Sequence, residues 1–267
     1  MAKFEKTQPG NPHGLTVNQH IFPRSCISRF ENADDRVEVK RVGNFQNTFT
    51  AVAEDPMFCA RRVWDQRTET LHSKSIESTY ARIADELAEG RLASLDSNRN
   101  EAISHFYDLC KDRYEATCNP HPDVKVGDVL GDPQLDKDKQ ERLERLGMLF
   151  VRPDGTMPGR MLAGIKIAAR GLYSRRVGSY PSWGVFRAQD GEFVVPDNFM
   201  VVRCIPVTPS IFLFADSADH LVGFEAVAEL NAIHIARAAK FCFSRNFDSC
   251  PVVKRTIPSK RFSFQIS

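Results

Sequence analysis

The sequence of 267 residues has no long apolar run and no large excess of charge of one sign. No stretch approaches the roughly 18 apolar residues that a membrane helix needs. The charged start, Met1–Lys6, has no apolar core behind it, so it does not fit a secretory signal. We therefore expect a cytoplasmic protein without a membrane partner. The formal net charge of only +2 argues against a global basic surface for nucleic acid, though a local basic patch stays possible.

Paired cysteine motifs are missing as well. The chain has seven cysteines, an odd number, and no two of them have C-x-x-C spacing. This argues against a zinc knuckle and against a disulfide framework. Several cysteines stand among apolar neighbours, as Cys204 does before Ile205, and such cysteines are typical of a packed core in a reducing compartment.

The common enzyme motifs are absent too. The sequence contains no Walker loop, no Gly-x-Gly-x-x-Gly, no Gly-x-Ser-x-Gly elbow and no His-Glu-x-x-His. These absences argue against nucleotide-dependent enzymes, against serine hydrolases of the common type and against zinc proteases. His105 and His121 have no partner at motif spacing, so we expect both to be incidental.

What is present is the composition of a globular protein, with 42% hydrophobic and 26% charged residues. The polar start, rich in Pro and Gly, predicts a flexible arm over 1–17. Residues 18–250 are expected to form a single α+β domain, and 251–267 a basic C-terminal tail. The Pro- and Gly-rich stretch 119–134 indicates a functional loop or lid.

Periodicity predicts the elements of this domain. Apolar residues at three- and four-residue steps predict helices, and alternation or short apolar runs predict strands. A hairpin is expected around the turn Asp190-Gly191. The predicted helices cover 75–89, 98–117, 135–150, 159–176 and 224–243, and the strands 36–53, 183–187, 191–195, 199–205 and 211–214. Because helices and strands are segregated, we predict a helical middle segment packed on a small, mostly antiparallel sheet.

Four blocks follow one another along residues 18–246. They are Asn18–Pro23 with Phe30, Ile76-Glu77 with the helix Ala102–Arg113, Gly191–Asn198, and Ile205–Pro209 with Asn231 and 236–244. Together they resemble the bacterial family catalogued as domain of unknown function 4238, with its His-x-x-Pro opening, Asp-Asn turn, Pro-x-x-Pro turn and closing Asn helix. Pro196 and Phe199 depart from that pattern, which usually has Ser and Pro there. The resemblance implies an architecture and a set of residues, and no established reaction.

His20 leads the candidate residues because imidazole titrates near neutral pH and can act as acid, base or metal ligand. Arg24 follows one turn later as a possible substrate-binding cation. The run His20–Ser25 is also similar to the opening of HNH nucleases, but the later Asn and His are not at HNH spacing. In the alternative interpretation, His20 ties down the N-terminal arm through a backbone hydrogen bond.

The other candidates come from distant parts of the chain. Glu77 and Arg113 lie on neighbouring predicted helices and can pair, either at an active site or as a structural ion pair. Asp197 and Asn198 follow a strand, where Asp197 could bind a metal, orient His20 or form an ordinary Asx turn. Asn231 shares an otherwise apolar helix face with His234, which favours a core role over substrate binding.

Two hypotheses follow from these residues. In the first, the protein is a hydrolytic toxin or effector, nuclease-like, acting on nucleic acid or a nucleotide, for example in antiphage defence. His20, Glu77, Arg113, Asp197 and Asn198 would be catalytic, Arg24 and Asn231 would bind substrate, and a divalent metal such as Mg²⁺ is a possible cofactor. In the second, it is a non-enzymatic interaction or regulatory protein of a defence or toxin–antitoxin complex.

Overall fold

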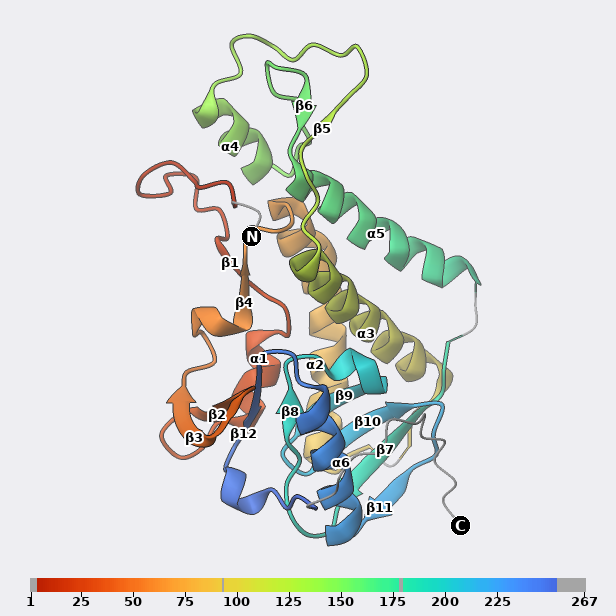
Figure 1. Ribbon diagram of the computed structural model, residues 1–267. Coiled ribbons are helices and arrows are strands. Elements are labelled where there is room, and N and C mark those ends of the chain that lie inside the picture. The colour runs from red at the N-terminus through yellow and green to blue at the C-terminus, as the bar shows by residue number, and fades with distance from the viewer. Residues whose placement is uncertain (1–3, 93, 178–179, 254–267) are drawn as a thin grey trace.

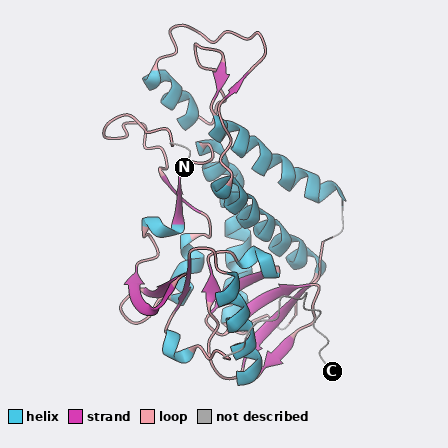
Figure 2. Cartoon of the chain, viewed as in Figure 1, coloured by secondary structure: helices cyan, strands magenta, loops and turns pink. Residues whose placement is uncertain are grey.

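The computed structural model describes residues 4–92, 94–177 and 180–253 (Figure 1). Two small four-stranded sheets lie at one end of the molecule, and long helices extend from them toward the other end (Figure 2). The strands are mostly antiparallel and occur together with six α-helices, so the predicted α+β class is confirmed for the described residues. None of the helices in these ranges is long and apolar enough to cross a membrane.

The first sheet has the order β3-β2-β12-β8 and is antiparallel throughout. It contains β2 (Val37–Arg41), β3 (Asn44–Ala51), β8 (Val195–Pro196) and β12 (Phe241–Ser244). The pair β2–β3 confirms the strands predicted within 36–53. Val37 and Val39 of β2 are buried at alternate positions, as expected for a half-buried strand.

The second sheet has the order β11-β7-β10-β9, in which only β11 and β7 run parallel. It contains β7 (Trp183–Ala188), β9 (Cys204–Thr208), β10 (Ile211–Ala215) and β11 (His220–Val222). Pro206 lies within β9, which is an edge strand and therefore tolerates a missing backbone N–H.

Two long helices carry the predicted Glu77 and Arg113. Helix α2 (Lys74–Ala88) buries Ile76, Tyr80, Ile83 and Leu87 at helical spacing, and Gly90 follows with a φ of 70°. Helix α3 (Ser97–Cys118) begins at Asp96, whose carboxylate accepts a hydrogen bond from the Arg99 amide at 2.8 Å. Both helices confirm the prediction, because their buried side chains recur with the helical period.

The remaining helices are α1 (Arg24–Ile27), α4 (Lys137–Arg145), α5 (Gly159–Val177) and α6 (Phe224–Arg237). Short 3-10 helices cover Ser28–Phe30, Pro56–Phe58, Phe199–Val202 and Phe247–Ser249, and a π-helix covers Thr68–Ser73. Strands β1 (Asn18–His20) and β4 (Cys59–Arg61) form a separate antiparallel pair. The predicted helix at 135–150 is shortened to α4, because the chain turns at Gly147 with a φ of 75°.

The predicted hairpin around Asp190-Gly191 is wrong. Gly191 does turn, with a φ of 78°, but β7 already pairs with β10 and β11 on its two edges. The chain after the turn therefore leaves that sheet, and the next strand, β8, pairs with β12. The predicted strand 199–205 is wrong in its first half, where a 3-10 helix ends at Arg203 with a φ of 49°.

The predicted helix 224–243 is also wrong beyond Arg237. At Ala238 the backbone becomes extended, with a ψ of 138°, and 241–244 form the inner strand β12. A short, largely apolar run such as 241–244 fits the helical and the strand period equally well. Its position between β2 and β8 in the sheet decides that it forms a strand.

Residues 119–158 form a segment that projects from the top of the molecule in Figure 1. It contains α4 and the two-stranded ribbon of β5 (Val124–Lys125) and β6 (Thr156–Met157). We call it the projecting segment.

The N-terminal arm lies against the projecting segment. Residues 4–17 have no regular secondary structure, but they are held rather than loose: Gln8 N donates to Glu141 Oε1 at 3.0 Å, and Leu15 is buried. The prediction of a flexible arm therefore misses its tertiary contacts. The predicted basic tail lies outside the described residues from 254 onward.

Candidate functional site

The first three of the four blocks, or residues directly beside them, meet at a cluster of aromatic rings in the core. The ring of Phe22 lies 5.0 Å from that of Phe199 and 6.3 Å from that of Phe106, and Phe106 stacks on Tyr80 at 3.7 Å. These rings come from the His-x-x-Pro run, the segment after the Asp-Asn turn, α3 and α2. The predicted catalytic residues lie within a few positions of these rings in the sequence. They are His20, Glu77, Arg113, Asp197 and Asn198.

His20 ends β1 and is half-buried. Its Nε2 lies 3.0 Å from the carbonyl oxygen of Ala53. A carbonyl only accepts, so Nε2 carries the hydrogen and Nδ1 carries a lone pair. The imidazole thus ties the start of the domain to the chain 33 residues later.

Cys59 is the strand partner of His20, so both side chains lie on one face of the β1–β4 pair. Burial raises the pKa of Cys59 to about 11, helped by the negative charges of Glu69 and Asp55. The group is therefore a neutral thiol at neutral pH and a poor nucleophile.

Glu77 and Arg113 form the ion pair that the sequence predicts. Arg113 Nη1 lies 2.7 Å from Glu77 Oε1, and Nη2 lies 3.6 Å from Glu69 Oε2. Trp64 donates to Glu69 at 2.6 Å, and the Arg113 guanidinium lies 5.3 Å from the centre of the Trp64 ring. Burial works to lower the pKa of Arg113, but the Glu77 and Glu69 carboxylates outweigh it and the pKa rises above its ordinary value.

Asp197 fastens the turn between α6 and β12. Its Oδ1 accepts from the Ala239 amide at 2.7 Å and its Oδ2 from the Lys240 amide at 2.8 Å, while its own amide donates to Phe241 O at 3.0 Å. Burial raises the pKa of Asp197, against the lowering effect of these amides. Both oxygens are thus engaged by amides 42 and 43 residues further along the chain, rather than by an amide two residues on as in the Asx turn considered from the sequence. Asn198 precedes the 3-10 helix without a side-chain cap bond.

Asn231 and His234 are both fully buried on α6. Asn231 accepts from the Val194 amide at 2.7 Å and donates to Glu192 O at 2.8 Å and Pro251 O at 2.9 Å. His234 Nδ1 lies 2.8 Å from Val194 O, and burial lowers the pKa of His234 to about 4. Asn231 thus links α6 to two other backbone segments, 192–194 and the one at Pro251, and has no surface from which to reach a substrate.

Arg24 lies at the surface and pairs with Glu54, with both side chains largely exposed. Such pairs contribute little to stability.

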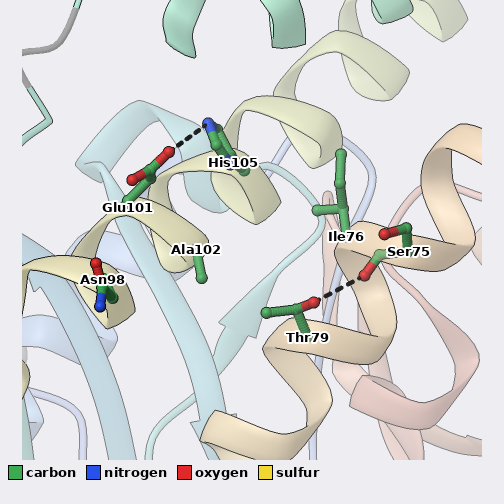
Figure 3. A pocket seen from close by; sticks show the side chains of 7 residues that line it. All are labelled: Ser75, Ile76, Thr79, Asn98, Glu101, Ala102 and His105. Carbon is green, nitrogen blue, oxygen red and sulfur yellow. Dashed lines mark hydrogen bonds and ion pairs between the residues drawn. The ribbon is translucent and has the colours of Figure 1, made fainter.

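Three cavities of about 220, 300 and 400 Å³ open beside α3, and none of the three is lined by a predicted site residue. The 300 Å³ cavity lies between α2 and α3, and its side chains include Ser75, Asn98 and His105 (Figure 3). His105 lies 3.9 Å from Glu101 and 2.8 Å from the Tyr180 hydroxyl. His105 therefore has partners in the fold, and its four-residue spacing from Glu101 on one helix could have indicated the first of them, while its predicted lack of a functional role stays a prediction.

The described ranges contain no group of three or more His, Cys, Asp and Glu side chains placed to hold a metal ion. A divalent metal such as Mg²⁺ therefore stays a prediction without a defined site.

Comparison with known protein families, with curated proteins and with solved structures gives no match. The resemblance to domain of unknown function 4238 stays a prediction that rests on the residues of the sequence.

Proposed function

We propose that the protein is a non-enzymatic interaction or regulatory protein, as in a defence or toxin–antitoxin complex. The observation that carries this proposal is that most candidate side chains form hydrogen bonds or ion pairs with other parts of the same chain. Both Asp197 oxygens accept from backbone amides, Asn231 bonds to three backbone groups in two segments, and Arg113 is buried in ion pairs. Groups used in this way hold a fold together and are not presented to a substrate.

The projecting segment supports the same proposal. Of the eleven large apolar side chains exposed in the described ranges, six lie on this segment, and Leu130 is 84% exposed. Apolar groups gathered at the surface of one segment favour contact with another protein.

The test compares wild type with His20→Ala in two settings, expression in bacteria and purified protein incubated with RNA, DNA and nucleotides. We expect equal growth and no degradation by either protein. Degradation by wild type that is lost in a folded His20→Ala variant would overturn the proposal.

A stability measurement adds an independent readout. Asp197→Ala removes a charged acceptor from the amides of Ala239 and Lys240, and because hydrogen bonds to charged groups are the stronger ones, we expect a loss of about 1–3 kcal/mol in the free energy of unfolding. Asp34→Ala is the matched control, because it removes a carboxylate from an exposed position. A catalytic Asp197 would instead be neutral or stabilising when removed.

A hydrolytic toxin or effector acting on nucleic acid or a nucleotide is the second candidate. It is favoured by His20, whose Nε2 is held by Ala53 O while Nδ1 keeps the lone pair that a general base needs. The same assays run with Mg²⁺ and with a chelator test this candidate and its metal together.

A further inference from the structure

One carboxylate of the N-terminal arm, that of Glu5, lies among three cations from three parts of the projecting segment and α5. Arg152 Nη2 lies 2.6 Å from Glu5 Oε2, and Lys137 of α4 and Arg160 of α5 pair with the same carboxylate. We call Lys137, Arg152, Arg160 and Arg62 the cationic socket. Burial raises the pKa of Glu5, but Arg160, Lys137 and Arg152 bring it down to about 2, so the group is a carboxylate at neutral pH.

The deepest part of the socket is buried and is held by Glu144, a carboxylate outside the arm. Glu144 Oε2 accepts from Arg62 Nη2 at 2.6 Å and from Arg160 Nη2 at 2.8 Å, and all three side chains are almost fully buried. Arg62 also donates from Nη1 to Glu5 O at 3.1 Å, while its buried Nε has no hydrogen-bond partner. Fixed guanidinium groups of this kind suit anions that carry several oxygens.

Without Glu5 the socket keeps an excess of positive charge. Its four cations would face three carboxylates, those of Glu141, Glu144 and Asp123. The donors of Lys137, Arg152 and Arg160 that Glu5 satisfies would all lack an acceptor. An anion that replaced Glu5 would restore both the charge balance and the hydrogen bonds.

The arm is attached in a way that permits such replacement. Before Glu5, the half-buried ring of Phe4 lies 4.3 Å from the Arg61 guanidinium, and this contact must be given up when the arm leaves. After Glu5 the contacts are polar: Gln8 donates to Glu141, and His13 lies 2.8 Å from Asp138. The first buried apolar side chain of the arm is Leu15, and Gly14 before it has a φ of 58° and open space, with no atom within 4 Å of where a Cβ would lie. Residues 4–13 can therefore leave the socket while Leu15 stays packed.

We propose that the cationic socket is a binding site for a phosphate group, and that Glu5 occupies it as a competitor within the chain. The carboxylate of Glu5 stands in for two oxygens of that phosphate. Displacing the arm opens the site, and binding of the phosphate keeps the arm away. This inference holds whether the protein acts as an interaction protein or as a hydrolase.

The test measures binding of inorganic phosphate by calorimetry to wild type, Glu5→Gln and Glu5→Gln with Arg152→Ala. We expect at least tenfold tighter binding to Glu5→Gln than to wild type, and loss of that gain in the double variant. Glu89→Gln is the matched control, because it removes one carboxylate from the end of α2 and changes the net charge equally. Equal binding to Glu5→Gln and Glu89→Gln would overturn the proposal, as would a double variant that binds as well as Glu5→Gln.

If Glu5→Gln does not fold, the double variant Gln8→Ala with His13→Ala loosens the arm without touching the socket. It should bind phosphate more tightly than wild type, and unchanged binding would contradict the proposal. Repeating the titrations with a nucleoside monophosphate identifies the source of the phosphate. Tighter binding than that of inorganic phosphate supports a nucleotide ligand, and equal binding supports free phosphate.

Discussion

Replacing Asn231 with Ala should be among the most destabilising single changes on α6. The side chain is fully buried and satisfies the Val194 amide together with the carbonyl groups of Glu192 and Pro251. A buried polar group left without a partner costs about 1–3 kcal/mol. Val194 N–H and Glu192 C=O are both buried here, so we expect a loss of about 2–5 kcal/mol in the free energy of unfolding.

Urea denaturation measures this loss as a lower midpoint with an unchanged slope. Asn231→Asp should also be destabilising, because a carboxylate accepts from Val194 N–H but cannot donate to the two carbonyl groups. Asn98→Ala is the control, since Asn98 is exposed on the first turn of α3. A loss below about 0.5 kcal/mol for Asn231→Ala, which is the size of an ordinary surface change, would refute the reasoning.

Three further predictions follow from burial and charge. Gly164→Ala should be destabilising, because a Cβ there would lie 2.5 Å from oxygens of two buried side chains, whereas Gly223→Ala meets no atom within 4 Å and should be tolerated in thermal melts. Cys118 is the exposed cysteine, so a thiol reagent should modify it first in the native protein and reach all seven thiols only in denaturant. The lowered pKa of Glu5 means that its carboxylate contributes stability above pH 4.5 that disappears as the pH falls toward 2. The stability difference between wild type and Glu5→Gln should therefore shrink over that window by about 1–2 kcal/mol, reduced by solvent screening.

Helical periodicity predicts much of this fold, because α2 and α3 bury one face along most of their length. Tyr80 and Phe106, one on each helix, stack in the core, and each belongs to a series of apolar residues visible in the sequence. The pairing of Glu77 with Arg113 follows from the same two helices lying side by side. Contacts between neighbouring, strongly periodic elements are thus within reach of sequence reasoning.

Strand pairing is not predicted in the same way, because it depends on partners far along the chain. The apolar run 241–244 continues the pattern of α6, yet it becomes β12 because β2 and β8 offer it two partners. Asp197 helps to set this boundary by accepting the amides of Ala239 and Lys240, just before the strand. The apolar pattern alone would allow α6 to continue past Arg237. A carboxylate 42 residues before Ala239 helps to end the helix there.

The ion pairs of the N-terminal arm are likewise not predicted from the sequence, because their partners lie far along the chain. The Pro and Gly residues of the arm predict looseness, since composition measures only local conformational preference. Glu5 meets Lys137 and Arg160 across 132 and 155 residues of sequence, and no spacing rule connects positions so far apart. Because the contacts of Glu5 are ionic and the nearest fully buried apolar side chain of the arm is Leu15, an outside anion can replace the interactions that hold Glu5 in place. The feature that sequence reasoning misses is therefore also the one that makes the arm a competitor for the cationic socket.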